Sequence, residues 1–272
     1  MTHTKKTSRT EERVRLYSLS AIVVIGISFA ILYFGNYHLS GYRLIKGGTL
    51  VIENIPTETF IYIDKFQKSS GGNKDKFIKN LSAGSHNVAV AKVGYWPYLK
   101  DIEIKSGDTY KLNFFVVPQS ASGVYIDVQD PKYQEIKNLF GKNILPSEES
   151  PLVSDDGLVA ISIKDNKIFA NWLGDQNEKP YYFCFPESLE DCTKTSIVSF
   201  DPITTIRNVT FYKGRNDSLL IAVLNGVFVL EIDPYGTQNF QPLFEGVEPN
   251  FRATDEGLYV LDQNNLALLP VY

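Results

Sequence analysis

Residues 16–34 read LYSLSAIVVIGISFAILYF and contain no charged side chain. As an α-helix rising about 1.5 Å per residue, this stretch is roughly 28 Å long, close to the hydrocarbon thickness of a bilayer. Apolar side chains occur on every face of such a helix, whereas a helix on the surface of a globular domain keeps one polar face. A helix buried in a soluble protein is the alternative, but it is rare in a small β-rich chain. The stretch therefore predicts a transmembrane helix over residues 16–35.

The two flanks of this predicted span differ in charge. Basic residues gather before it, at Lys5, Lys6, Arg9, Arg13 and Arg15, and only Arg43 and Lys46 follow it closely. By the positive-inside rule, residues 1–15 form a cytoplasmic tail and the chain after the span is exported. The prediction is a single-pass plasma-membrane protein that contacts the lipid bilayer through residues 16–35.

A cleaved signal peptide is the alternative to an uncleaved anchor. Its apolar core covers about 7–15 residues and is followed by small residues at the cleavage site. The apolar core here is longer, and residues 33–39, YFGNYHL, are mostly bulky. We therefore expect the helix to remain as a signal anchor.

The composition after the span is typical of strands. The chain has 272 residues and a formal net charge of −4, so it offers no basic patch for nucleic acid. Tyr and Phe are abundant, at 16 and 17 residues, and Val, Ile and Thr are frequent outside the span. About 225 residues follow a short connector at 36–47, enough for two modest domains. The expected fold class is mainly β.

A series of strand-like runs begins at residue 48. The runs are TLVIEN at 49–54, FIYID at 60–64, residues 77–81, SHNVAVAKV at 85–93, residues 99–104 and residues 110–117. Pro56 and glycine-containing turns separate these runs, and KSSGGNKD at 68–75 predicts a polar loop. The spacing predicts a compact domain of short strands over residues 48–118.

The order of these residues resembles the PEGA domain. The matching positions are Gly48, Leu50, Pro56, Tyr62, Ile63, Asp64, Leu81, Gly84, His86, Val88, Val90, Gly94, Tyr95 and Gly107. The segment that names the family is Pro56-Thr57-Glu58-Thr59 in this chain, Lys65 replaces a usual glycine, and Ala83 replaces a proline. The resemblance implies a small antiparallel β-sandwich of the kind found in bacterial envelope and surface proteins, usually without catalytic residues.

Residues 119–150 are predicted to be a linker. Its start, PQSASG at 118–123, is small and polar. The segment PKYQEIKNLFG at 131–141 predicts one short helix, because Pro131 stands at its start and its apolar residues share one helical face.

Residues 151–272 contain three segments of similar layout. In each segment a strand is followed by a tight hairpin turn and a second strand, and in two of them an acidic-glycine turn precedes the first strand. The hairpins are predicted at Asp165-Asn166, Asn225-Gly226 and Asn264-Asn265. A period of about 45–55 residues is the scale of propeller blades, and the layout resembles WD- and TolB-type blades. Closed propellers typically have four or more blades. We therefore expect an open propeller-like domain whose edge is covered by a partner or by a second copy of the chain.

The two cysteines of the chain, Cys184 and Cys192, lie close together in CFPESLEDC. A disulfide persists outside the cytoplasm, where this segment is predicted to lie. We therefore expect Cys184 and Cys192 to pair, and two free buried thiols are the alternative. A redox motif needs closer spacing, and a zinc site needs further ligands.

The histidines argue against common hydrolytic sites. They are His3, His38 and His86, so residues 151–272 cannot form a Ser-His-Asp or Cys-His site. Metalloprotease-helix, P-loop and dinucleotide-binding motifs do not occur in the sequence. The sequence therefore predicts no catalytic residue, no metal site and no cofactor.

Two acidic pairs each precede a glycine, Asp155-Asp156 before Gly157 and Asp255-Glu256 before Gly257. Paired carboxylates can serve as a general acid and base or as ligands of a calcium loop. Asp and Gly are also the residues that a turn between strands requires. Because the same placement occurs in two repeats, we interpret both pairs as turn residues.

Aromatic residues are the remaining candidates for a binding surface. Trp96, Trp172, Tyr181 and Tyr182 are candidate partner-binding residues, because aromatic rings stack on sugars; in strands such residues more often belong to the core. The predicted function is a non-catalytic envelope protein that binds cell-wall polysaccharide or another surface protein. A ligand-sensing or accessory subunit of a membrane complex is the alternative, and an extracellular hydrolase that uses the Asp pairs is the third hypothesis.

Overall fold

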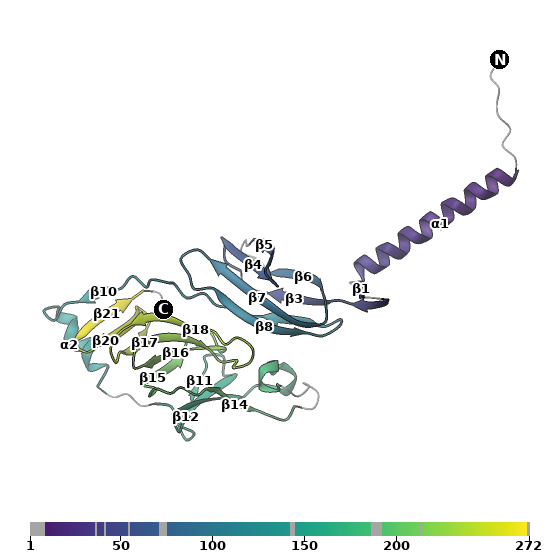
Figure 1. Cartoon of the computed structure of the whole chain (residues 1–272). Helices are drawn as coiled ribbons and strands as arrows, with labels where there is room; N and C mark the ends of the chain where they lie inside the picture. Colours follow the sequence, from purple (N-terminus) through teal and green to yellow (C-terminus); the bar gives the residue numbers. More distant parts are fainter. Residues whose placement is uncertain are drawn as a thin grey trace, which may run out of the picture. The chain divides into compact units, whose positions relative to one another are not determined.

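A computed structural model describes residues 9–35, 37–40, 42–53, 55–70, 75–141, 145–185, 192–212 and 214–270. These residues are mainly β, with an apolar helix at the N-terminal end and several separate sheets, as expected (Figure 1). The chain divides into two compact units. The first contains Met1–Pro56, Gly72–His86 and Glu103–Asn113, and the second contains Thr57–Gly71, Asn87–Ile102 and Phe114–Tyr272.

Helix α1 (Arg9–Phe34) contains the predicted span. Its segment Val14–Tyr33 is long and apolar enough to cross a membrane, and none of that segment is buried inside the protein. The hydroxyl groups of Ser18, Ser20 and Ser28 donate to carbonyl oxygens one turn earlier in the same helix. These polar groups are therefore satisfied without water, as a lipid environment requires.

The first unit continues with a hairpin and a three-stranded sheet. The hairpin consists of β1 (Tyr37–Ser40) and β2 (Arg43–Lys46), within the segment predicted as a connector. The sheet has the order β6-β3-β9, formed by β3 (Gly48–Ile52), β6 (Lys76–Leu81) and β9 (Thr109–Leu112). β3 pairs antiparallel with β6 but parallel with β9, so this sheet is mixed.

A second sheet of this region has the order β5-β4-β7-β8. Its strands are β4 (Thr59–Ile63), β5 (Phe66–Ser70), β7 (Gly84–Lys92) and β8 (Tyr98–Ile104). Two local predictions were wrong. The loop expected at 68–75 begins with the end of β5, and the strand expected at 110–117 ends at Leu112.

Three four-stranded antiparallel sheets follow. The first contains β11 (Leu152–Val153), β12 (Val159–Lys164), β13 (Lys167–Trp172) and β14 (Ser196–Phe200); the second contains β15 (Asn208–Phe211), β16 (Ser218–Val223), β17 (Gly226–Glu231) and β18 (Phe240–Glu245). The third contains β19 (Asn250–Thr254), β20 (Gly257–Asp262), β21 (Asn265–Leu269) and the earlier strand β10 (Val124–Ile126), which pairs with β21. In the described residues these sheets do not close into a barrel. This arrangement is consistent with the expected open repeat domain.

The three predicted hairpins are present, but two of them turn one residue earlier than expected. Asp165 and Asn166 have φ of 50° and 61°, the left-handed values of a two-residue hairpin turn. In the second hairpin Val223 pairs with Gly226, so Gly226 belongs to β17 and not to the turn. A Cβ at Gly226 would lie 2.5 Å from the Phe244 carbonyl oxygen, so glycine allows β18 to approach.

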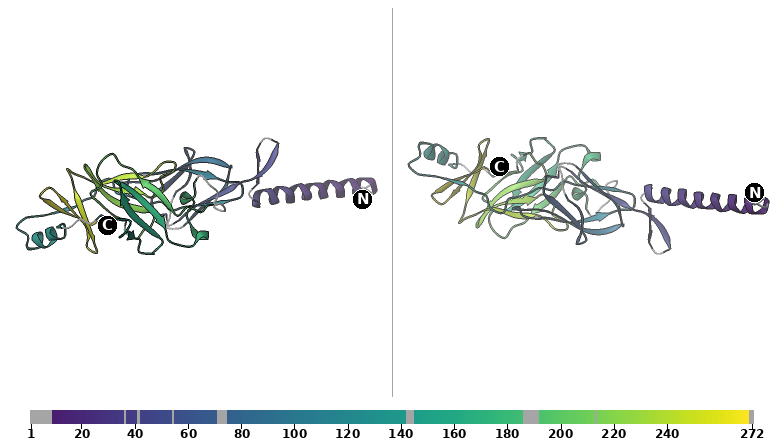
Figure 2. Two further views of the ribbon diagram at one scale, coloured as in Figure 1. Left: turned by 90° about the horizontal axis from the view of Figure 1, so that it is seen from below. Right: turned by 90° about the horizontal axis from the view of Figure 1, so that it is seen from above.

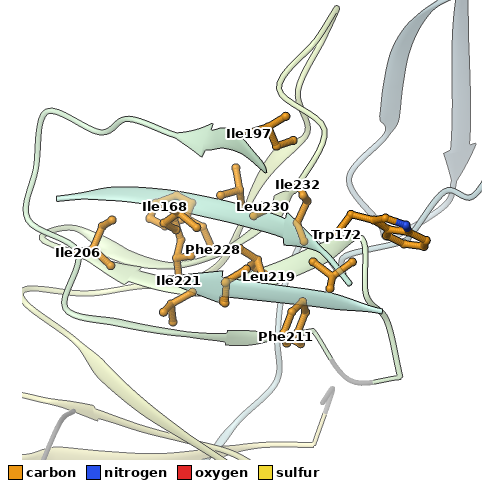
Figure 3. Packing of buried hydrophobic residues seen from close by; sticks show 14 of the residues in the cluster. Ile168, Trp172, Ile197, Ile206, Phe211, Leu219, Ile221, Phe228, Leu230 and Ile232 are labelled. Carbon is orange, nitrogen blue, oxygen red and sulfur yellow. The ribbon is translucent and has the colours of Figure 1, made fainter. Parts of the chain in front are cut away.

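One hydrophobic core joins the β11–β14 and β15–β18 sheets (Figure 3). Its labelled members are Ile168, Trp172, Ile197, Ile206, Phe211, Leu219, Ile221, Phe228, Leu230 and Ile232. The expected short helix is α2 (Pro131–Asn138), which begins after the N-cap Asp130. Tyr133 and Ile136 of α2 pack on Tyr259 and Leu266, so the helix covers one face of the third sheet.

Candidate functional site

The predicted disulfide is present. Cys184 and Cys192 are bonded, their Cα atoms are 5.3 Å apart, and both are buried. Lys179, itself buried, donates from Nζ to the carbonyl oxygens of Cys192 at 3.3 Å and Lys194 at 2.6 Å. In the chain-entropy model, closing a loop of this length contributes about 2–3 kcal/mol. The disulfide and the hydrogen bonds of Lys179 together hold the connection between β13 and β14 in place.

The predicted partner-binding aromatics lie in different places. Trp172 is 6 % exposed, and its Nε1 donates to the carbonyl oxygen of Asp175 at 3.0 Å, so this ring belongs to the core. Trp96 is half-buried, and its Nε1 donates to the carbonyl oxygen of Pro242 at 3.1 Å. Tyr182 packs against the buried Phe183, with the ring centroids 4.9 Å apart and the ring planes tilted.

Tyr181 belongs to a different group, here called the aromatic cluster: Tyr181, Phe185 and Tyr235. The Tyr181 and Phe185 rings are 5.9 Å apart, and the Phe185 and Tyr235 rings are 4.5 Å apart. Each of the three residues is half-buried. The cluster joins the 3₁₀ helix η2 (Tyr181–Phe183) to the connection between β17 and β18. Here two segments distant in sequence bring partly exposed aromatic rings together.

Strand β8, the end of β17 and the β17–β18 connection share a buried polar group. We call it the polar junction: Tyr98, Lys100, Glu231, Asp233 and Asn239. Lys100 is 2 % exposed, and its Nζ lies 3.2 Å from Glu231 Oε1 and 2.8 Å from Asp233 Oδ2. Tyr98 Oη donates to Glu231 Oε1 at 2.6 Å, and Asn239 Nδ2 donates to Glu231 Oε2 at 2.9 Å. The junction therefore places one cation between two carboxylates, away from solvent.

The electrostatics of the polar junction are dominated by burial. Burial raises the pKa of Glu231 above its ordinary value, although Lys100 and the donors Tyr98 and Asn239 oppose the shift. Because Lys100 is enclosed, a substrate in solution cannot contact the charged groups. The paired charges can therefore join β8 to the end of β17 within the second unit.

Asn239 also protects the edge of a sheet. Its side chain accepts from Leu99 N at 2.9 Å and donates to Leu99 O at 2.8 Å, and β8 is the edge strand of its sheet. The amide group thus pairs with the backbone N–H and C=O of Leu99 on an edge strand, where unpaired groups invite aggregation.

Asp101, on the same strand, accepts from Asn87 Nδ2 at 3.0 Å and Thr237 Oγ1 at 2.7 Å, and these bonds lower its pKa. Gly236 has φ of +64°, and a Cβ there would lie 2.8 Å from the Asp101 carbonyl oxygen. Only glycine therefore allows the β17–β18 connection to approach β8 so closely.

One member of each acidic pair, Asp156 and Glu256, accepts hydrogen bonds inside the protein. Asp156 accepts from Ser154 Oγ at 2.6 Å, Leu158 N at 3.0 Å and Asn216 Nδ2 at 2.5 Å. Burial alone would raise the pKa of Asp156, but these bonds outweigh it and hold the pKa below its usual value. This is the bonding of a turn residue.

The other acidic pair behaves differently. Glu256 accepts from Tyr259 Oη at 2.5 Å, which raises the pKa of Tyr259 to about 12. His86 is buried on β7, and its Nε2 lies 2.8 Å from the carbonyl oxygen of Ser82. In the described part of the chain, no group of three or more His, Cys, Asp or Glu residues is placed to hold a metal ion.

The sequence named Tyr181 as a candidate partner-binding residue, which stays a prediction, but it gave no indication of the polar junction. One signal was available: Tyr98, Ile102 and Ile104 occupy alternate positions of YLKDIEI at 98–104, and Lys100 falls in the same series. An ionisable side chain at an apolar position of a strand needs a buried partner of opposite charge.

Comparison with known proteins identifies one segment of the chain. No curated protein matches the chain. Residues 47–119 match the PEGA domain, within two residues of the boundaries predicted from the sequence. The chain therefore carries a PEGA domain that begins immediately after the β1–β2 hairpin.

Proposed function

We propose that this protein is a non-catalytic, membrane-anchored surface protein whose exported β domains bind a partner in the cell envelope. The observation that carries the proposal is the order of three features. An apolar, unburied helix of membrane-spanning length is followed by a short hairpin and then by a PEGA domain. PEGA domains occur in extracellular and surface proteins, so the helix serves as a signal anchor with the N-terminus in the cytoplasm.

The aromatic cluster is the proposed binding surface. Tyr181, Phe185 and Tyr235 offer half-buried rings from two segments that the disulfide and the core hold in place. Flat rings held by a rigid support stack on sugars or pack on the apolar groups of a protein. Cell-wall polysaccharide is the proposed partner class, and a surface protein is the alternative.

The proposed topology has a direct test. Because the basic residues precede the span, protease added to intact spheroplasts should remove everything after α1 and leave only the short N-terminal fragment. A reporter fused after Tyr272 should be active only outside the cytoplasm. Full protection of the chain from protease in intact spheroplasts, with digestion after lysis, would overturn the topology.

The absence of catalysis is tested at Asp156. We expect Asp156→Asn to lower the free energy of unfolding by about 1 kcal/mol or less, because Asn retains an acceptor for the Leu158 N–H. The purified protein should not hydrolyse glycans, peptides or esters. Turnover by the wild type that Asp156→Asn abolishes, with the unfolding transition unchanged, would favour the hydrolase.

Partner binding is tested with the aromatic cluster. Tyr235→Ala should reduce retention on isolated cell-wall polysaccharide, whereas Phe66→Ala, which changes an aromatic ring that is 69 % exposed on β5, should not. Equal retention of both variants and the wild type would remove the cluster from the proposal.

A further inference from the structure

The end of α1 is closely attached to the hairpin that follows it. Gly35 N donates to Ile31 O at 2.8 Å, so helical geometry continues to Gly35. A Cβ on Gly35 would lie 2.6 Å from the Ile31 carbonyl oxygen and 2.9 Å from the ring of Tyr37. Glycine at this position therefore lets the Tyr37 ring pack directly on the last turn of the helix.

The other end of the hairpin is attached to the first sheet. Ser106 Oγ donates to the Lys46 carbonyl oxygen at 2.8 Å. A Cβ on Gly107, which has φ of +80°, would lie 3.1 Å from Cδ of Lys46. The hairpin is thus held at both ends, between α1 and β3.

The length of the span places the hairpin in depth. The 20 residues of Val14–Tyr33 rise about 30 Å, which is the thickness of the hydrocarbon layer. The polar headgroup layer beyond it is about 5–8 Å deep on each side. Because Tyr37 contacts Gly35, only two residues after Tyr33, its ring falls within this layer when α1 spans the bilayer.

The direction of the hairpin matters as much as its depth. Figure 2 shows β1 and β2 running sideways from the end of α1, across the helix axis. A transmembrane helix is tilted by about 20° on average from the bilayer normal. Strands that cross the axis of such a helix therefore lie along the membrane surface and do not point away from it.

The side chains of the hairpin suit that position. In the register of β1 and β2, Tyr37 lies opposite Lys46, so Tyr37, Leu44 and Lys46 share one face. Tyr37 is 40 % exposed, Leu44 is 49 % exposed, and the Tyr42 side chain is fully exposed. Tyrosine rings with polar tips beside an aliphatic group are typical of membrane–water interfaces, whereas the Lys46 side chain lies along Gly107 of the first sheet.

We propose that β1 and β2 lie flat in the lipid headgroup layer on the outer face of the membrane, with Tyr37, Tyr42 and Leu44 in contact with lipid. The occupant of this exposed surface is the membrane itself, because the surface continues directly from the span. The proposal rests on the membrane anchoring proposed above. It goes further in assigning the hairpin a lipid contact that fixes the PEGA domain close to the bilayer.

Spin labels on single introduced cysteines test the proposal. Because Cys184 and Cys192 are bonded to each other, an introduced thiol reacts alone. The variants are Ile25→Cys in the span, Tyr42→Cys in the hairpin, and Phe66→Cys as a matched exposed aromatic outside it. Each full-length variant is reconstituted in phosphatidylcholine–phosphatidylglycerol vesicles, and collision of the label with oxygen and with a water-soluble nickel chelate is measured.

We expect the oxygen-to-nickel accessibility ratio at position 42 to be several-fold higher than at position 66 and lower than at position 25. A water-exposed label at 42 beside a lipid-exposed label at 25 would overturn the hairpin proposal and leave the anchor standing. A water-exposed label at 25 would overturn the anchor, and with it the hairpin proposal. A label at 42 shielded from both reagents would mean that a second copy of the chain covers the hairpin, which also overturns the lipid contact.

Discussion

Lys100→Met should lower the free energy of unfolding by about 3–5 kcal/mol, the cost of leaving buried carboxylates without their cation. Lys100 Nζ contacts both Glu231 and Asp233, and its side chain is 2 % exposed. Methionine fills a similar volume, so lost packing contributes little to this cost. Urea denaturation of the intact protein in detergent measures the change. A matched control is Lys111→Met, where the side chain is 74 % exposed and 3.9 Å from Glu53, so its effect should stay within about 0.5 kcal/mol.

The decrease in the free energy of unfolding caused by Lys100→Met should depend on pH. Lys100 opposes the raised pKa of Glu231, so its removal raises that pKa further above the ordinary 4.5. A carboxyl with a raised folded-state pKa adds stability below its unfolded pKa, and this stability is lost as pH rises through the folded pKa. The variant should therefore be closer to the wild type at about pH 5 than at about pH 8.

Neutralising the carboxylates gives the complementary result. The triple variant Lys100→Met, Glu231→Gln, Asp233→Asn should recover most of the lost stability, because no uncompensated charge remains buried. A single Lys100→Met variant as stable as the wild type at every pH would show that the junction is not closed in solution.

The sequence was sufficient for features that depend on local physics. The uncharged apolar run of residues 16–34 predicted the span contained in α1, and the Asp165-Asn166 pair predicted a tight hairpin, whose two turn residues are left-handed in the structure. Pro131 predicted the start of α2, and in the structure the side chain of the preceding Asp130 accepts from Lys132 N. Each of these signals lies within a few residues of the structure it specifies.

Features that depend on pairing between distant segments were not predictable in the same way. β10 completes the sheet of β19–β21 although more than a hundred residues separate β10 from β21 in the chain. The parallel pairing of β3 with β9 likewise depends on the path of the chain between them. Turn chemistry placed the second hairpin one residue late, because Gly226 is required for close approach to Phe244 and not for the turn.

The features of the candidate site differ in the same way: some depend on local sequence, and others depend on contacts between distant segments. The disulfide was predictable from the spacing and the expected compartment, and Asp156 was predictable as a turn residue. Which aromatic residues share a surface was not, because Tyr181 and Tyr235 are brought together by Phe185 only in the folded chain. Glu231 ends a strand of otherwise apolar residues, and its partner Lys100 is 131 residues away.

Trp172→Ala should also lower the free energy of unfolding by about 3–5 kcal/mol, as truncation of a buried tryptophan generally does. The indole packs in the core shared by the β11–β14 and β15–β18 sheets, 6.0 Å from the Phe183 ring. Trp172→Phe keeps most of the apolar volume but loses the hydrogen bond from Nε1 to the Asp175 carbonyl oxygen. Its cost should be smaller, about 1–3 kcal/mol, since that carbonyl is left without its donor.

Comparison with Tyr181→Ala separates a core role from a binding role. Tyr181 is half-buried in the aromatic cluster, so its truncation should reduce stability less than Trp172→Ala and reduce retention on cell-wall polysaccharide more. Urea denaturation and retention are measured on the same full-length preparations, with Trp172→Phe as the intermediate case. Because Trp172 is 6 % exposed, any Trp172→Phe protein that remains folded should bind as the wild type does. Lost retention by folded Trp172→Phe, with Tyr181→Ala binding normally, would place the binding surface at Trp172 and remove it from the aromatic cluster.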